Sequence, residues 1–308
     1  MTEAEEAAAA WSAGRATLIH ERENAVLSLP LPGGGRAALR LHRPGYQSAA
    51  AIRSELFWTE ALAGAGLPVP RPIRTAAGAL LHSLSTGRLA SAVSWLPGTP
   101  LGRAWEPLSG SVPAQMATFR QVGALLARLH AATDALALPA DFTRPSWDAE
   151  GLLGEAPLWG RFWENPALTP SESALLQEAR GEARRRLAAL PAPDFGLIHA
   201  DLMRENILID GPVLSLIDFD DSGWGYRGYD LATLMLQNLD EPHWPALLAA
   251  AAEGYAALRP LDVAALPMFV ALRSFASCGW AVPRLAPGSP HLRHYATRAV
   301  AQAKAFLS

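Results

Sequence analysis

Two acidic residues and an asparagine lie close together in the sequence, at a spacing that suits one particular chemistry. Asp201 lies five positions before Asn206, and the apolar run 213–217 ends at Asp218. A carboxylate can accept the proton of an attacking hydroxyl, and carboxylate and amide oxygens are hard ligands suited to Mg²⁺. The Asp-x4-Asn spacing followed by Asp-Phe is typical of phosphoryl transfer. We therefore predict that Asp201 is a general base and that Asn206 and Asp218 bind Mg²⁺.

The residues between these groups predict the element that positions them. The apolar run 207–209 is followed by an Asp-Gly-Pro turn at 210–212 and then by the second apolar run. Two such runs joined by a short turn predict a β-hairpin. The polar loop would lie at one end of this hairpin and the acidic cluster at the other.

The stretches HADLMREN (199–206) and LIDFDD (216–221) resemble those of the aminoglycoside phosphotransferase-like kinase family. This family includes choline kinases, a class of homoserine kinases and a bacterial stress-response Ser/Thr kinase. The resemblance extends to YDLA (229–232) and to an N-terminal block, and covers nearly the whole chain. It implies a protein-kinase-like α+β fold, with a small N-terminal lobe of antiparallel sheet plus one helix and a larger, mostly helical C-terminal lobe. It also implies that ATP and Mg²⁺ bind in the cleft between the lobes.

The same resemblance gives two residues a supporting role. His199 would brace the catalytic loop rather than react. Asp230 lies near the start of a helix expected at 229–239, where a negative charge is favourable, and the resemblance implies that it braces the loop as well.

The N-terminal part predicts a sheet followed by a helix. Strands are expected at 16–20, 25–29 and 37–41, with two more near 79–83 and 90–95, and a helix at about 49–62. In kinases the third strand carries a lysine that contacts the α- and β-phosphates and pairs with a glutamate on the next helix. Here that position holds Arg40, which can supply charge and a fork of donors. We predict that Arg40 contacts the phosphates and that Glu55 is its partner.

Two turns of this sheet could lie near phosphates. The three glycines at 33–35 permit a phosphate-binding loop, but a plain turn is the favoured interpretation, because they form the second hairpin turn. In the resembled family the first turn, here 21–24, covers the phosphates, and Asn24 is therefore included among the nucleotide-binding residues.

The segment Trp95-Leu96-Pro97-Gly98 breaks the strand pattern. We place the boundary at this segment, giving an N-terminal lobe of 1–96 and a C-terminal lobe of 97–308. The resemblance implies that Trp95 and Leu96 belong to a hinge that meets the adenine edge. Beyond it the chain reads as helical, with a buried face at 122–129 and further helices at 170–190, 244–258, 262–282 and 290–306.

Composition excludes several classes of function. The 308 residues carry a net charge of −3, which gives no indication of nucleic acid or an anionic membrane as a partner. The one cysteine, Cys278, excludes an internal disulfide and a cysteine-based metal site. The acidic N-terminus lacks the positive flank of a signal peptide, and no apolar run approaches the length of a membrane span. We expect a cytoplasmic protein and make no prediction of its oligomeric state.

The sequence leaves the acceptor open among homoserine, choline, an aminoglycoside, a sugar and a protein hydroxyl. The acidic pair Asp220 and Asp221 would suit an amine on the acceptor, although a turn held by these side chains explains them equally well. A quaternary ammonium would need an aromatic cage, for which there are four candidates that are also ordinary core residues. These are Trp224, Tyr226, Tyr229 and Trp280.

The segment between Asp218 and Asp230 is short. It runs from 219 to 229, which offers little room for a phosphorylation switch or for docking a peptide. We therefore expect a small-molecule acceptor and activity without prior phosphorylation, with a stress-response-type protein kinase as the alternative. A nucleotide-binding pseudokinase would usually have lost Asp201, Asn206 or Asp218, and a metallohydrolase built around His199 would need more histidines nearby.

Overall fold

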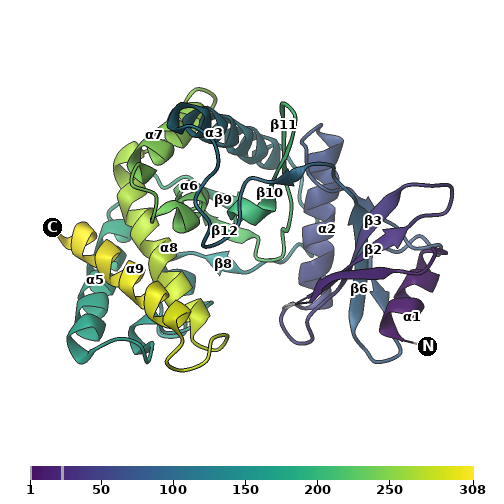
Figure 1. The fold of residues 1–308 in the computed structure, drawn as a ribbon, viewed down its shortest axis with the longest axis horizontal. Helices are drawn as coiled ribbons and strands as arrows, with labels where there is room; N and C mark the ends of the chain where they lie inside the picture. The colour runs from purple at the N-terminus through teal and green to yellow at the C-terminus, as the bar shows by residue number, and fades with distance from the viewer. Residues whose placement is uncertain (1, 22–23) are drawn as a thin grey trace. The chain divides into compact units, whose positions relative to one another are not determined.

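The computed structural model describes residues 2–21 and 24–308 and has an α+β fold, as the sequence predicted (Figure 1). It divides into two compact units. Unit 1 comprises the residues up to Thr99 together with Ala135–Arg144 and Ile207–Asp220, and unit 2 comprises Pro100–Asp134, Pro145–Asn206 and Asp221–Ser308. The predicted boundary at 96/97 lies close to the point, between Thr99 and Pro100, where the chain first passes from unit 1 to unit 2. The two later segments join unit 1 through long-range contacts, such as the hydrogen bond from the Leu216 amide to the Pro68 carbonyl at 3.0 Å.

Unit 1 is built on an antiparallel sheet with the order β1-β2-β3-β6-β4, and β5 pairs with β6. The strands are β1 (Thr17–Glu21), β2 (Ala25–Pro30), β3 (Arg36–Leu41), β4 (Pro72–Ile73), β5 (His82–Ser83) and β6 (Leu89–Ser94). The glycines at 33–35 connect β2 to β3, all with positive φ, as a turn requires. The turn predicted to cover the phosphates includes residues 22 and 23, which lie outside the described part of the chain.

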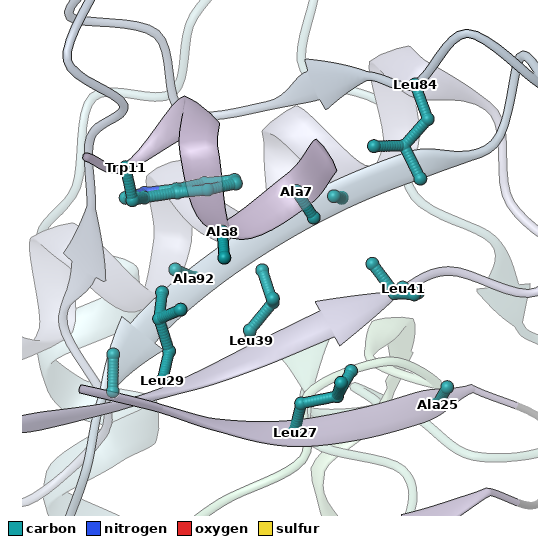
Figure 2. Close-up of a cluster of buried hydrophobic side chains, with 12 residues drawn as sticks. Ala7, Ala8, Trp11, Ala25, Leu27, Leu29, Leu39, Leu41, Leu84 and Ala92 are labelled. Carbon is teal, nitrogen blue, oxygen red and sulfur yellow. The ribbon is translucent and has the colours of Figure 1, made fainter. Parts of the chain in front are cut away.

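One face of this sheet is covered by a helix formed by the N-terminal segment, in addition to the one helix predicted to follow the third strand. Helix α1 (Glu3–Ala10) begins with a capping box between Thr2 and Glu5. Its buried side packs against alternate residues of β2, β3 and β6, which all point to one face because side chains alternate along a strand (Figure 2). The cluster contains Ala7, Ala8, Trp11, Ala25, Leu27, Leu29, Ala37, Leu39, Leu41, Leu84, Ala90 and Ala92.

The other face of β3 carries the arginine predicted to contact the phosphates. Leu39 and Leu41 point to the α1 side, so Arg40 points away from it. Helix α2 (Ala49–Gly64) supplies Glu55 to Arg40. Its start is fixed by Ser48, whose hydroxyl accepts a hydrogen bond from the Ala51 amide at 3.1 Å.

The predicted hairpin is present as β10 (Ile207–Asp210) and β11 (Val213–Leu216), paired antiparallel from Ile207–Leu216 to Asp210–Val213. The expectation that the polar loop and the acidic cluster lie at opposite ends of the hairpin was wrong, because this register makes the chain enter and leave the hairpin at the same end. Strand β7 (Thr99–Pro100) extends this sheet. Gly98 precedes it with φ of 110°, and a Cβ there would lie 2.7 Å from the Ile209 carbonyl oxygen. Glycine is therefore required at the end of the predicted hinge.

Unit 2 is mostly helical. A small sheet of order β8-β12-β9 joins β8 (Ser146–Trp147), β12 (Gly223–Tyr226) and β9 (Phe195–Ile198). The helices are α3 (Val112–Asp134), α4 (Ala149–Leu153), α5 (Pro170–Ala188), α6 (Arg227–Met235), α7 (Trp244–Ala256), α8 (Leu266–Ala281) and α9 (Pro290–Leu307). Short 3₁₀ turns lie at η1 (Phe162–Glu164), η2 (Arg204–Asn206), η3 (Leu236–Asn238) and η4 (Val263–Ala265).

The expectation that no apolar run approaches the length of a membrane span was wrong. The segment Val263–Ala281, which includes α8, is long and apolar enough to cross a membrane by length and composition alone. Within unit 2, however, 78% of its apolar window is buried. An apolar segment buried to this extent has the character of a core helix.

Candidate active site

The predicted catalytic loop, in unit 2, folds back on itself and brings Asp201 and Asn206 together. The η2 turn reverses the chain, so that Asn206 Nδ2 donates to the Asp201 main-chain carbonyl at 2.8 Å and to Asp201 Oδ2 at 3.1 Å. In the described part of the chain, the amide oxygen of Asn206 has no hydrogen-bond partner and is available to a ligand. The structure thus places the predicted base beside a hard oxygen donor.

The backbone of this loop is held by hydrogen bonds to Asp230, which lies in the first turn of α6. Its two carboxylate oxygens accept hydrogen bonds from the amides of His199 at 2.8 Å and Ala200 at 2.7 Å. Ala200 has φ of 63°, a left-handed conformation that costs a residue with a side chain about 1–2 kcal/mol. The two bonds to Asp230 offset that strain and fix the loop just before Asp201. Both predicted braces, His199 and Asp230, are fully buried.

Asp230 is in turn held by a chain of buried polar groups. It lies 3.0 Å from His130 Nε2, and His130 Nδ1 lies 2.8 Å from the Tyr255 hydroxyl. Burial lowers the pKa of His130, which is therefore neutral at pH 7. Burial alone would raise the pKa of Asp230, but the hydrogen bonds from His130 and from the loop amide outweigh it and lower that pKa. The carboxylate therefore stays charged under a loop that presents only donors to it.

Two further loop residues, absent from the sequence predictions, act as anchors. Arg204 is 2% exposed, and its guanidinium bonds Asn238 Oδ1 at 2.8 and 3.0 Å, Glu241 at 2.9 Å and the Glu106 carbonyl at 2.5 Å. Glu205 accepts from the Ala104 amide at 2.6 Å. An arginine beside a motif has no periodic signal that would distinguish it from a surface residue, so sequence reasoning missed this role.

Unit 1 holds the second group of predicted residues. Arg40 forms an ion pair with Glu55, lies 3.2 Å from Asp220 Oδ1 and lies 3.9 Å from Asp218 Oδ1. Burial disfavours the charged form, but these carboxylates outweigh it and raise the pKa of Arg40. The guanidinium is thus a fixed positive charge among acidic groups, at the position where kinases carry a phosphate-contacting lysine.

Asp218 lies at the end of β11 in a left-handed conformation, with φ of 64°. Of its side chain, 51% is exposed. Desolvation by the surrounding loop raises the pKa of Asp218 to about 6, opposed by Arg40 and assisted by Asp220 and Glu55. Because half of the side chain meets water, screening weakens this effect. An exposed carboxylate among acidic neighbours is suited to a cation.

Asp220, predicted weakly as an acceptor residue, is 8% exposed and has its carboxylate occupied inside unit 1. Oδ1 faces Arg40, and Oδ2 accepts from Asn24 Nδ2 at 2.9 Å. Asn24 also accepts from the Arg43 amide at 2.8 Å, so this predicted nucleotide-binding residue connects the start of β2 to the acidic loop. Arg144, which sequence reasoning missed, donates to the Asp220 carbonyl at 2.5 Å.

The predicted hinge residues lie at the edge of unit 1. The guanidinium of Arg36 lies 3.6 Å from the centre of the Trp95 ring, and the Trp95 amide donates to the Arg36 carbonyl at 3.3 Å. Leu96 is partly buried. The Trp95 side chain therefore packs on the sheet. A role of this segment as the predicted hinge would therefore use its main chain and not the Trp95 ring.

The aromatic residues considered for a cage belong largely to the core of unit 2. Tyr229 is fully buried and stacks on Trp147 with ring centres 5.9 Å apart. Tyr226 is 9% exposed and packs against Phe195 and Phe269. The Asp221 carbonyl accepts from Trp147 Nε1 at 2.9 Å. These contacts are those of a packed sheet.

The two remaining cage candidates are partly buried. Trp224 is paired within β12, between β8 and β9, and Trp280 neighbours Trp159 and Tyr295. With Tyr226 and Tyr229 in the core, the four residues do not provide an open cage.

Comparison with known proteins places these residues in a family. A family model described as the phosphotransferase enzyme family matches residues 17–266. A protein of Deinococcus radiodurans without an assigned function is 35% identical over 257 residues, which are 79% of this chain and 70% of that protein. A homoserine kinase of Acidiphilium cryptum is 34% identical over 68% of this chain, and the match covers 62% of that enzyme.

A solved structure of a microcompartment-associated aminopropanol kinase is 29% identical, with a TM-score of 0.79, and the match covers 96% of this chain and 90% of that one. The matches to homoserine kinases span less than two thirds of those enzymes' length. The range of the family model includes every residue predicted to act as base, to bind metal or to bind nucleotide. The chain therefore belongs to the phosphotransferase enzyme family.

Proposed function

We propose that this protein transfers the γ-phosphoryl group of ATP to a hydroxyl of a small-molecule acceptor, in a reaction that requires Mg²⁺. The observation that carries the proposal is the pairing of Asp201 with Asn206 in a loop fixed from both sides. Phosphoryl transfer asks a protein mainly to position groups and to stabilise charge, and this loop is held rigidly enough to do so.

Each residue has a definite task in this reaction. Asp201 accepts the proton of the acceptor hydroxyl as the oxygen attacks phosphorus. Arg40, oriented by Glu55, contacts the phosphates, and the main chain at Trp95 and Leu96 meets the adenine edge. Asn24 and Asp220 support this arrangement from within unit 1 instead of contacting the acceptor.

Each proposed metal ligand, taken by itself, is of a kind that magnesium prefers. No group of three or more His, Cys, Asp or Glu side chains in residues 2–21 and 24–308 could by itself hold a metal. The proposed ligands are of another kind, an available amide oxygen on Asn206 and an exposed carboxylate on Asp218, which phosphate oxygens would complete. When bound, the ion neutralises charge on the phosphates.

The strand pairing of the segment 219–229 favours a small acceptor. Strand β12 (Gly223–Tyr226) lies within this segment and is paired on both sides, with β8 and with β9. A strand with two partners offers no free edge to an extended peptide. Its burial also leaves it unsuited to switch between order and disorder. This supports activity without prior phosphorylation and disfavours the alternative of a protein kinase.

The names of two relatives suggest where to look for the acceptor. A homoserine kinase and an aminopropanol kinase are both named for compounds that carry a hydroxyl and an amine. We propose a small hydroxylated amine of this type as the acceptor, with choline and aminoglycosides as further members of the panel. The acidic pair gives this no added support, because Asp220 is used internally.

The test is MgATP consumption against a panel of small hydroxyl compounds and generic protein substrates, before and after phosphatase treatment. Phosphorylated small molecules, identified by mass, are expected from both samples. The variant Asp201→Asn should retain ATP binding and lose about 10²-fold or more in kcat, and Asp218→Ala should lose the magnesium dependence of ATP binding.

Three results would overturn parts of this proposal. Phosphorylation of protein without any small-molecule product would refute the acceptor class, and loss of activity after dephosphorylation would refute the absence of a switch. ATP binding without turnover on any substrate, water included, would favour a pseudokinase.

A further inference from the structure

Helix α8 carries one charged residue, Arg273, at the centre of an otherwise apolar and small-residue sequence. Its side chain is 2% exposed. Burying a guanidinium is costly unless it is paired and hydrogen-bonded. The position of this arginine, far from the motifs in the sequence, therefore requires a partner in the fold.

That partner is the proposed base. Arg273 Nη2 donates to Asp201 Oδ1 at 2.9 Å, and Nη1 donates to the Ser277 hydroxyl one turn along the same helix, also at 2.9 Å. The indole ring of Trp159 covers the guanidinium, with its centre 4.5 Å from Cζ. The arginine is thus fixed by its own helix and by an aromatic face.

Asp201 is consequently held by donors at both of its carboxylate oxygens. Arg273 bonds Oδ1, and Asn206 Nδ2 bonds Oδ2 at 3.1 Å. Two donors on opposite oxygens resist rotation of the carboxylate about its last side-chain torsion, while 24% of the side chain stays exposed to a reactant. The plane of the carboxylate, and so the direction of its lone pairs, is set by α8.

A purely stabilising role explains this arrangement poorly. A buried ion pair is often no more stabilising than apolar residues of similar volume. Apolar residues fill neighbouring positions of α8: Val270, Leu272, Phe275 and Ala276 are all buried. What an apolar side chain could not supply is a donor aimed at Asp201.

We propose that Arg273 is a positioning residue, which orients the Asp201 carboxylate toward the acceptor hydroxyl and does not itself touch the acceptor. This inference rests on the proposed function, in which Asp201 is the base. It predicts that Arg273 matters only when Asp201 is present, because its effect on the reaction passes through that carboxylate.

The experiment is a double-mutant cycle with Asp201→Asn and Arg273→Met. Turnover is measured with the best acceptor of the panel, and also as hydrolysis of MgATP, in which water is the acceptor. Arg273→Met alone should lower kcat about 10–100-fold, the scale of a small misplacement of a reacting group, with the KM for ATP unchanged. In the Asp201→Asn background the same change should cost less than about twofold.

Two milder variants keep the test informative if Arg273→Met folds poorly, which circular dichroism would show. Arg273→Lys keeps the charge but offers no fork, so it should restore part of the activity. Ser277→Ala removes one support of the guanidinium and should lower kcat by a few fold. Ser274→Ala is the matched control, because its hydroxyl donates to the Val270 carbonyl on the same helix and not to Arg273.

The outcomes distinguish the base itself from the residue that positions it. If Asp201→Asn keeps full turnover, the base assignment is wrong. If Asp201→Asn is impaired but Arg273→Met costs the same factor in both backgrounds, or if Arg273→Lys is no better than Arg273→Met, the base stands and the positioning role is refuted.

Discussion

The substitution Asp230→Asn would remove one negative charge beneath the catalytic loop while preserving the shape of the side chain. Asp230 accepts hydrogen bonds from the His199 and Ala200 amides, one on each oxygen, and contacts His130 Nε2. An asparagine has one acceptor oxygen, so one of the two buried amides must lose its partner. We expect the loop to be destabilised and displaced.

The size of the effect follows from these contacts. A buried N–H left without an acceptor costs about 1–3 kcal/mol, and turning a charge-assisted hydrogen bond into a neutral one costs about 1 kcal/mol more. We therefore expect the free energy of unfolding to fall by about 2–4 kcal/mol. The strain at Ala200 adds to the displacement, because the bond that offsets it is one of the two at risk. A shift of about 1 Å at Asp201 would lower kcat by up to about 10²-fold.

The assay is urea unfolding followed by tryptophan fluorescence, since most tryptophans lie in unit 2, together with turnover. Asp262→Asn is the matched control. Asp262 also accepts from two amides, those of Ala264 and Ala265, but as an exposed helix cap, where asparagine serves equally well. If Asp230→Asn costs no more stability than Asp262→Asn and remains fully active, the bracing role of Asp230 is refuted.

Two further predictions concern stability. Because burial lowers the pKa of His130 from 6.5, the unfolded chain takes up a proton near pH 6.5 that the folded protein does not, so the free energy of unfolding should fall as pH drops below about 6.5. His130→Gln should flatten this dependence, and an equal slope in both proteins would contradict the assignment. A methyl group on Gly123 of α3 would overlap the Ala251 carbonyl of α7, so Gly123→Ala should lower stability by more than about 2 kcal/mol in thermal unfolding. Gly181→Ala, in the open interior of α5, should raise stability by about 0.5–1 kcal/mol; similar effects at both glycines would refute the close packing of α3 on α7.

Local spacing made part of the geometry of the candidate site predictable. The apolar runs and the turn between them specify the hairpin β10–β11, and with it the positions of Asn206 just before its first strand and of Asp218 just after its second. Alternation along β3 and the start of α2 likewise bring Arg40 to Glu55, since a strand and the helix after it have few ways to pack. The hairpin and the Arg40–Glu55 contact depend on residues that are near one another in the chain, so they could be predicted from the sequence alone.

Packing between distant segments decided the rest. Arg273 reaches Asp201 across 72 residues, and Arg144 reaches Asp220 across 76. The sequence indicated only isolated arginines in a helix and a loop, because a contact of this kind leaves no periodicity. The covering of the sheet by α1, and the burial that turns Asp220 from an acceptor candidate into an internal support, also depend on tertiary structure. The sequence by itself predicted which groups could do the chemistry, and the tertiary structure decided which side chains hold them, because orientation requires donors brought from elsewhere in the fold.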